Sequence, residues 1–280
     1  MEARTPAEIL AYASDVGLAK ATRKTSAVWI LSFFAGAFIA FAAQGSNMAA
    51  YNLLAKADTY GLGRVLAGAV FGTGLMMVLL AGAELFTGNN LIIVTVLDKR
   101  TSAALMFKNW VMVYIGNLVG SVLIAWMMSE SGLFNSSGGL LGGMTIRIAA
   151  GKTALAFHSA VILGILCNWL VCLAVWASWS AKDVPGKVMT IFFIICLFVT
   201  SGFEHSIANM YYIPAGILAK QNPDWVAHAN VTAERLANLN WTTFFTKNLL
   251  PVTIGNIIGG VCFVGALYWV AFKKKAEKKD

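Results

Sequence analysis

The chain has 280 residues, of which 58% are hydrophobic and only 12% are charged, and its mean hydropathy is +0.70. A soluble domain carries about 25% charged residues because its surface faces water, so this composition excludes an ordinary soluble protein and predicts an integral membrane protein. The net charge of +8 does not indicate nucleic-acid binding, because the basic residues lie at the ends of apolar runs and suit membrane topology.

The first 27 residues form a mixed polar segment, in which we expect no cleavable signal peptide. Within it, residues 6–20 place Ile9, Leu10, Ala13 and Val16 at helical spacing. This pattern predicts an N-terminal amphipathic helix on the cytoplasmic membrane surface, and the first apolar span then acts as the insertion signal.

Six apolar stretches are long enough to cross a bilayer core of ~30 Å, which takes about 20 residues of helix. The second and fifth are too long and too interrupted for one simple crossing. We therefore predict an all-α polytopic membrane domain over residues 28–272 with broken second and fifth helices, followed by a solvated basic tail over 273–280. The six stretches are 28–51, 65–97, 110–128, 153–179, 188–218 and 245–272.

The distribution of Lys and Arg predicts the orientation. Fourteen of these residues fall on the side of the two termini and seven on the other side. Because segments rich in Lys and Arg stay on the cytoplasmic side of a membrane, we expect both termini in the cytoplasm and a multi-pass protein of the cytoplasmic (inner) membrane.

The two halves of the chain share a motif. Lys108-Asn109 precedes Gly116-Asn117, and Lys247-Asn248 precedes Gly255-Asn256 at the same spacing, while the span before each motif carries one glutamate. This predicts two repeats, about 28–130 and about 153–272. Each has three spans, an odd number, so the second must be inverted, and inverted repeats with broken helices mark a transport path near the midplane.

Ionisable residues occur inside two of the spans. Glu84 is alone in the second, and Glu204 and His205 are together in the fifth. A charge at this depth costs several kcal/mol unless it is paired or faces a cavity. Helix-weakening residues lie beside both sites, so we expect the two breaks to surround one pore. Those residues are Thr87, Gly88, Asn89 and Asn90 in the first half and Ser201, Gly202 and Asn209 in the second.

We interpret Glu84 and Glu204 as structural acceptors for backbone N–H groups freed at the breaks rather than as direct substrate contacts, because a carboxylate would repel an anion. Glu204 is nevertheless grouped with the candidates for the substrate pore and proton relay, since it is the neighbour of His205. His205 is the best candidate for a functional group, because imidazole can exchange a proton with a weak acid near neutral pH. Thr87 and Asn168 are neutral donors that serve either as substrate contacts or as helix–helix hydrogen bonds.

Other residues have both a structural and a functional interpretation. Lys152 is either an interfacial anchor or a cation that draws anions toward the pore. Six apolar side chains either pack the core or form constrictions that a hydrated ion cannot pass: Phe71, Leu75, Leu85, Phe86, Val171 and Phe198. The four cysteines lie in apolar stretches without CxxC spacing, so we expect core residues rather than disulfides, and neither a metal site nor a cofactor.

Five stretches of the sequence resemble the formate/nitrite transporter family. They are GAELFTGNN (82–90), the KNW…YIGN segment, GILCNWLVCLAVW (164–176), SGFEHSIANMYYIPAGI (201–217) and NLLPVTIGNIIGG (248–260). The resemblance spans nearly the whole chain. It implies an aquaporin-like fold without the aquaporin sequence motif, and a homopentamer with one substrate pore in each protomer.

The resemblance also implies roles for individual residues. His205 matches the central histidine with Glu204 as its neighbour, Thr87 the loop threonine and Lys152 the vestibule lysine. Asn168 matches the partner asparagine, and the six apolar residues named above match the constrictions. The family varies at the last three positions of the Thr-Gly-Asn-Asn interruption, which leaves the gating of this loop, and any gating by the N-terminal helix, open.

The predicted function is a passive or proton-coupled channel for small monovalent anions of weak acids, with protonation assisted by His205. Formate ranks first, and nitrite or hydrosulfide remain alternatives within the same family. A neutral-solute pore is disfavoured because the chain lacks paired NPA motifs and has a single mid-membrane histidine. A membrane enzyme is disfavoured because no nucleophile motif, metal-ligand spacing or cofactor fingerprint is present, so no catalytic residue is assigned.

Overall fold

The computed structural model describes the backbone of residues 2–276 and the side chains of residues 2–273, and every regular element in this range is helical. The predicted all-α membrane fold is confirmed. The last four residues of the predicted basic tail lie outside the described range. Six helical segments are long and apolar enough to cross a membrane: Thr25–Leu54, Tyr60–Gly82, Ala103–Glu130, Phe157–Ser178, Val184–Ser201 and Trp241–Lys273.

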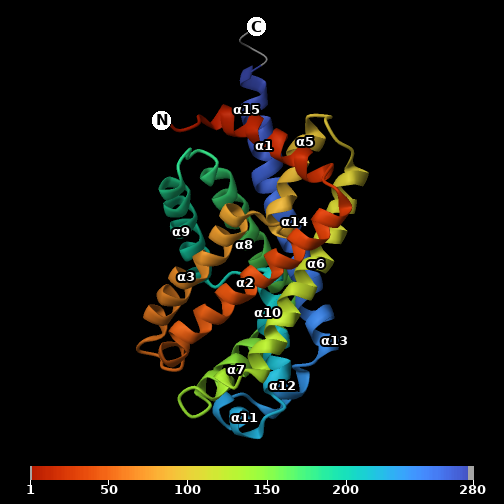
Figure 1. Cartoon of the computed structure of the whole chain (residues 1–280). Helices are drawn as coiled ribbons and strands as arrows, with labels where there is room; N and C mark the ends of the chain where they lie inside the picture. The colour runs from red at the N-terminus through yellow and green to blue at the C-terminus, as the bar shows by residue number, and fades with distance from the viewer. Residues whose placement is uncertain (1, 277–280) are drawn as a thin grey trace.

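The first half contains three spans, the second of which is broken as predicted (Figure 1). Helix α2 (Thr25–Leu54) is followed by α3 (Tyr60–Met77), which ends in the π-helical turn η1 (Val78–Gly82). After the interruption, the span resumes as α4 (Phe86–Asn89), η2 (Asn90–Ile92) and α5 (Ile93–Leu97). Helix α6 (Ala103–Glu130) completes this half.

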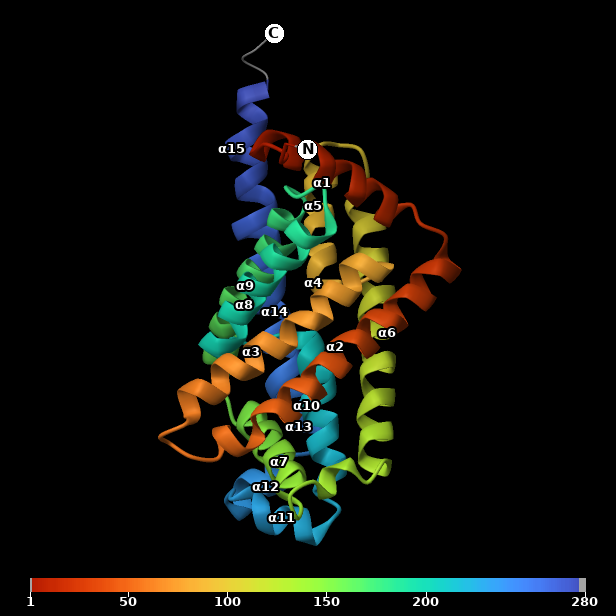
Figure 2. The same cartoon turned by 60° about the vertical axis from the view of Figure 1, so that its left-hand side comes forward.

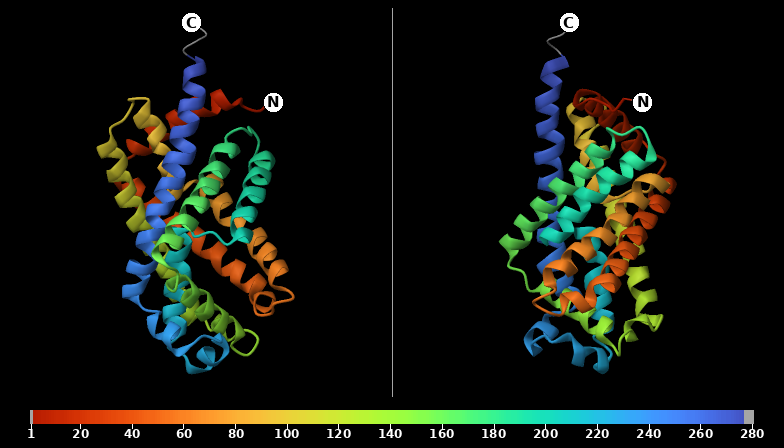
Figure 3. Two further views of the ribbon diagram at one scale, coloured as in Figure 1. Left: turned by 180° about the vertical axis from the view of Figure 1, so that it is seen from behind. Right: turned by 90° about the vertical axis from the view of Figure 1, so that its left-hand side faces the viewer.

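The second half repeats this order with the opposite direction through the membrane. It consists of α8 (Phe157–Ser178), α9 (Val184–Ser201), α10 (Ser206–Ala219) and a last span. That span comprises α13 (Trp241–Thr243), η4 (Phe244–Leu249), α14 (Leu250–Ile258), η5 (Gly259–Ala266) and α15 (Leu267–Ala276). Helix α15 extends beyond the other spans on the side of the termini (Figure 3).

Shorter helices lie at both ends of the bundle. Helix α1 (Pro6–Ala21) lies across the end that holds both termini, and its start is fixed by a capping box between Thr5 and Glu8 (Figure 2). At the other end, α7 (Leu140–Thr153), α11 (Pro223–Ala229) and α12 (Ala233–Asn238) occupy segments that the hydropathy pattern left as loops (Figure 1). The fourth span consequently begins at Phe157, and the predicted start at residue 153 belongs to α7.

The two interruptions begin in the same way. Gly82 and Gly202 have φ of 86° and 83°, a left-handed conformation that glycine adopts without a steric penalty. Each glycine stands two residues before a glutamate, whose backbone N–H is bonded to a neighbouring span. The Glu84 N–H donates to the Leu31 carbonyl at 3.1 Å, and the Glu204 N–H donates to the Leu163 carbonyl at 3.2 Å. The sequence repeat therefore encodes the same backbone turn twice.

Candidate functional site

The glutamate of the first break belongs to a group that we call the N-side quartet: Lys20, Glu84, Asn89 and Asn109. The Lys20 Nζ contacts the Glu84 carboxylate at 2.8 Å, and the Asn89 Nδ2 donates to the same carboxylate at 2.7 Å. The Asn89 amide also donates to the Asn109 Oδ1 at 2.8 Å, and the Asn109 Nδ2 donates to the Lys20 carbonyl at 3.2 Å. The quartet joins α1 to the broken span and to α6.

The second break carries a far-side quartet: Lys152, Glu204, Asn209 and Asn248. The Lys152 Nζ contacts Glu204 at 2.8 Å, and the Asn209 Nδ2 donates to Glu204 and to the Asn248 Oδ1, both at 2.7 Å. The Asn248 Nδ2 donates to the Lys152 carbonyl at 3.0 Å. The two lysines lie in the last turns of α1 and α7, so these two helices contribute equivalent residues to the two halves.

The partners of the two carboxylates differ from the expectation. Side chains of lysine and asparagine, rather than backbone N–H groups, donate to both glutamates in the part of the chain that the structure describes. The prediction that backbone N–H groups donate to these two carboxylates is therefore wrong. Two buried carboxylates are retained because each has a lysine partner and amide donors, which offset the cost of desolvation.

The Gly-Asn motifs stabilise the two helix breaks through close helix packing and side-chain hydrogen bonds. A Cβ atom at Gly116 would lie 1.9 Å from the Ser32 Oγ, and one at Gly255 would lie 2.2 Å from the Val161 carbonyl, so only glycine allows these helices to approach so closely. The asparagine that follows each glycine then reaches the interruption. Asn117 accepts from the Phe86 N–H at 3.0 Å and donates to the Glu84 carbonyl at 2.9 Å.

Asn256 makes the same contacts in the second half. It accepts from the Ser206 N–H at 2.9 Å and donates to the Glu204 and Gly164 carbonyls at 3.0 and 2.8 Å. Both asparagines are fully buried. They satisfy backbone groups that the broken helices leave without partners, which is the condition for irregular backbone at membrane depth.

Between the two quartets, a side chain from the first break contacts a side chain from the second. The His205 Nε2 lies 2.9 Å from the Thr87 Oγ1, and both side chains are buried. His205 also caps α10, because its Nδ1 accepts from the Ala208 N–H at 3.2 Å. A neutral ring with an accepting Nδ1 carries its proton on Nε2, so Nε2–H donates to Thr87. The Thr87 hydroxyl proton is then free to bond a third group.

Asn168 supports the first break. Its Nδ2 donates to the Asn90 Oδ1 at 2.9 Å and to the Asn256 and Thr87 carbonyls at 2.7 and 3.3 Å. Asn90 in turn donates to the Phe86 carbonyl at 3.2 Å. Of the two interpretations that the sequence left open for Asn168, these contacts favour the helix–helix hydrogen bond.

Two cavities lie near the Thr87–His205 pair: His205 lines one of them, Gly88, the neighbour of Thr87 in the chain, lines the other, and Thr87 itself lines neither. The N-side vestibule has a volume of about 200 Å³ and contains Lys20, Arg23 and Glu84 in its wall. The far vestibule has a volume of about 320 Å³, and its wall contains Arg64, Arg147, Lys152, Glu204 and His205. Cations outnumber carboxylates in both walls, so both cavities favour anions.

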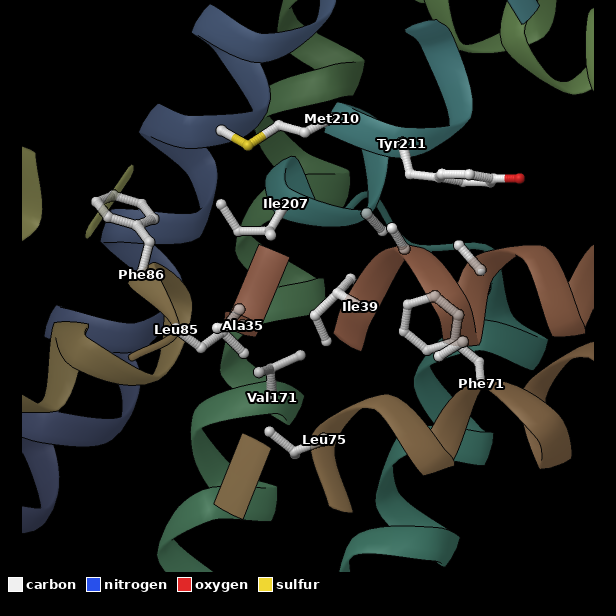
Figure 4. Close-up of a cluster of buried hydrophobic side chains, with 14 of the residues drawn as sticks. Ala35, Ile39, Phe71, Leu75, Leu85, Phe86, Val171, Ile207, Met210 and Tyr211 are labelled. Atoms are coloured by element: carbon white, nitrogen blue, oxygen red, sulfur yellow. The ribbon is translucent and has the colours of Figure 1, made fainter. Parts of the chain in front are cut away.

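The predicted apolar residues are all buried, and they divide between the cavities. Phe71 and Phe198 line the far vestibule with ring centroids 5.7 Å apart, whereas Leu75 and Leu85 line the N-side vestibule. Figure 4 shows Leu75, Leu85 and Val171 within one cluster of buried hydrophobic side chains.

Phe86 and Val171 line neither cavity. The Phe86 ring packs edge-on against Trp110 and Tyr114 of α6, with centroid distances of 6.0 and 4.9 Å. A constriction at Phe86 or Val171 stays a prediction.

Several charged residues of these walls were not singled out in the sequence. Lys20 and Arg23 contact Glu84, which is more than 60 positions away, and no local pattern signals such a pair. Arg147 lines the far vestibule, is exposed, and has no salt-bridge partner among residues 2–273. Lys152, the expected anion-attracting cation, lines the far vestibule, pairs with Glu204 and lies 5.3 Å from the centre of the Tyr212 ring.

Comparison with known proteins shows which family shares these sequence and structural features. The sequence profile described as Formate/nitrite transporter matches residues 7–270. The chain is 37% identical to a probable formate transporter of Methanothermobacter thermautotrophicus, across 97% of this chain and 98% of that protein. It is also 37% identical to the formate channel FocA of Escherichia coli strain K12, across 97% of this chain and 95% of that protein.

Two solved structures have the same fold. A pentameric formate channel with formate bound superposes with a TM-score of 0.79 at 35% identity, covering 89% of this chain and 98% of the other. An FNT family ion channel gives a TM-score of 0.73 at 28% identity, covering 94% of this chain and 97% of the other. With two inverted halves, paired helix breaks and matches along nearly its whole length, the chain belongs to the formate/nitrite transporter family of multi-pass membrane proteins.

Proposed function

We propose that the protein is a channel for formate and related weak-acid anions, which cross as the neutral acid after protonation through His205 and Thr87. One observation carries this proposal: the two broken helices bring Thr87 and His205 to 2.9 Å at a buried point near two cavities with a cationic excess. The formate channels among the relatives support formate as the first substrate, with nitrite and hydrosulfide as alternatives.

Entry depends on the charges of the vestibules. Arg64, Arg147 and Lys152 face a single carboxylate, Glu204, in the far vestibule. On the other side, Lys20 and Arg23 face Glu84. These cations raise the local concentration of small anions. Because each glutamate is tied to its lysine, neither is free to repel the substrate or to act alone as a base.

The Thr87–His205 pair then moves the proton. His205 first takes a proton at Nδ1, which requires it to release the Ala208 N–H. The Nε2 proton passes to the Thr87 Oγ1 while the Thr87 hydroxyl proton passes to the anion. The products are a neutral acid and a neutral imidazole that carries its proton on Nδ1. The starting tautomer is restored when the His205 Nε2 takes up a new proton and the Nδ1 releases its proton.

Apolar side chains next to the pair favour the neutral form. Phe71 and Phe198 on one side and Leu75 and Leu85 on the other offer no hydrogen bond to an ion that has lost its water. Moving an isolated carboxylate through such surroundings costs far more than moving the neutral acid. The constrictions therefore select for molecules that can be protonated.

We further propose a homopentamer with one pathway in each protomer, by analogy with the matched pentameric channel. Large apolar side chains on the outer faces of the spans, such as Phe107, Val111 and Phe193, are exposed in the protomer and suit contact with lipid or with a neighbouring copy. Both termini lie at one end of the bundle (Figure 1), and we assign that end to the cytoplasmic face of the inner membrane from the distribution of Lys and Arg.

Solute entry into liposomes tests the proposal. The purified protein is reconstituted, and re-swelling after a hyperosmotic shock is followed by stopped-flow light scattering with formate, nitrite, hydrosulfide, chloride and glycerol in turn. Rapid re-swelling with one or more of the three weak-acid anions, but not with chloride or glycerol, is expected. Equal entry of glycerol would replace the anion channel by a neutral-solute pore.

A further inference from the structure

The two quartets differ at one oxygen atom. In the N-side quartet, the Asn89 Oδ1 accepts from the Lys20 Nζ at 2.9 Å. In the far-side quartet, the Asn209 Oδ1 is buried and has no hydrogen-bond partner in the part of the chain that the structure describes. The orientation of the Asn209 amide is fixed, because its Nδ2 donates to both Glu204 and Asn248. The far-side quartet therefore contains an unpartnered acceptor that its matching half lacks.

A second unpartnered amide lines the same cavity. Asn47 of α2 is 3% exposed, its Nδ2 is enclosed, and its side chain makes no hydrogen bond within residues 2–273. Asn209 and His205 also line this cavity. A buried amide without a partner destabilises a protein by about 1–3 kcal/mol, and each such group in a folded protein calls for a water or a ligand.

We propose that Asn47 and Asn209 form a binding station for the neutral weak acid in the far vestibule, a step that rests on the proposed function. The carbonyl oxygen of formic acid accepts from the Asn47 amide, and its hydroxyl donates to the Asn209 Oδ1. The anion cannot make the second bond, because it has no proton to donate and its charge is repelled by the amide oxygen. The station thus binds the acid in the form that His205 and Thr87 release.

The station accounts for the difference between the two quartets, in which only the Asn209 oxygen lacks a partner. On the N-side, Lys20 donates to the Asn89 oxygen, so this oxygen already has a partner. On the far side, Lys152 bonds Glu204 and lies over Tyr212, and it leaves the Asn209 oxygen open. The neutral acid is therefore held on one side of the central pair and the anion is attracted on both.

The test compares Asn47→Leu with Asn52→Leu in liposomes. Leucine has nearly the shape of asparagine but no donor, and Asn52 is an exposed residue of the same helix that does not line the cavity. The readout is formate-driven acidification of the liposome lumen, reported by a trapped pH dye, together with the thermal stability of the purified protein. We expect Asn47→Leu to lower the acidification rate about three- to ten-fold, the effect of one hydrogen bond, and Asn52→Leu to leave it unchanged.

Stability separates a binding role from a structural one. Because the Asn47 side chain makes no hydrogen bond within residues 2–273, Asn47→Leu is expected to keep or raise the melting temperature while transport falls. An acidification rate within two-fold of that of Asn52→Leu, at about equal stability, would overturn the station and assign the two amides to trapped water. If Asn47→Leu does not fold, Asn47→Ala decides in the same assay. No formate entry by the unmodified protein would instead refute the channel itself.

Discussion

At the scale of single residues, the proposed function depends on a contact between two side chains that are 118 positions apart. His205 could be identified from the sequence because an ionisable residue inside a span needs a partner or a cavity. That Thr87 is the partner could be expected only from the matching break in the other half. The tautomer of His205 follows from the Ala208 N–H, which the sequence does not reveal.

Removing the Thr87 hydroxyl tests this contact. Thr87→Val keeps the shape of the side chain but breaks the path between His205 and the substrate, so we expect formate flux into liposomes to fall about ten-fold or more. Thr145→Val is the matched control, since the Thr145 hydroxyl is equally buried but bonds only the Leu141 carbonyl of its own helix. Equal flux in the two variants would contradict a role for Thr87 in proton transfer.

At the scale of elements, the Gly-Asn motifs were visible in the sequence as a repeat, but their purpose was not. The glycines allow helices to approach, and Asn117 and Asn256 then bond three groups each around the breaks. Hydropathy located the spans and both interruptions. It did not reveal α7, α11 and α12, because these helices are short or glycine-containing and are stabilised by packing rather than by an apolar run.

Asn256→Leu tests the role assigned to these asparagines. It removes three buried hydrogen bonds and leaves the Ser206 N–H and the Glu204 carbonyl at the break without their Asn256 partner, so we expect a loss of about 3 kcal/mol or more in stability. The melting temperature in detergent is the measurement. Asn238→Leu, at an exposed position of α12, serves as the control. A melting temperature equal to that of this control would show that the breaks are held by other contacts.

Asp98, directly after α5, attaches the C-terminal helix. Its carboxylate accepts from the Trp269 Nε1 at 2.8 Å and from the Lys273 Nζ at 3.1 Å. Burial raises the pKa of Asp98, but hydrogen bonds with Ser14, Trp269 and Lys273 outweigh it and hold the pKa below its ordinary value. A lowered pKa stabilises the folded state above the ordinary value of about 3.9, and this contribution is lost as the pH falls through the lowered value.

Asp98→Asn should therefore destabilise the protein at neutral pH by about 1–2 kcal/mol. The difference from the unmodified protein should shrink as the pH is lowered below about 4. Thermal unfolding at a series of pH values measures both effects, with Asp58→Asn as the control because Asp58 is exposed. A difference that persists unchanged in acid would refute the stabilising role of the Asp98 charge.

At the scale of the whole molecule, two inverted halves build one path from matching parts. The sequence predicted the inversion from an odd number of spans and located Glu84, Glu204 and the breaks. It did not predict that α1 and α7 supply equivalent lysines, because Lys20 and Lys152 lie outside the repeated motif. Charges distant in sequence gather in the vestibules only once the chain is folded.

The central claim is that the proton passes through His205, and His205→Asn in liposomes tests it most directly. Formate flux and proton uptake are measured together at two pH values, for this variant and for the unmodified protein. Asparagine cannot exchange a proton, so the variant should pass the anion by a leakier route whose rate does not depend on pH. A pH dependence equal to that of the unmodified protein would contradict proton transfer by His205.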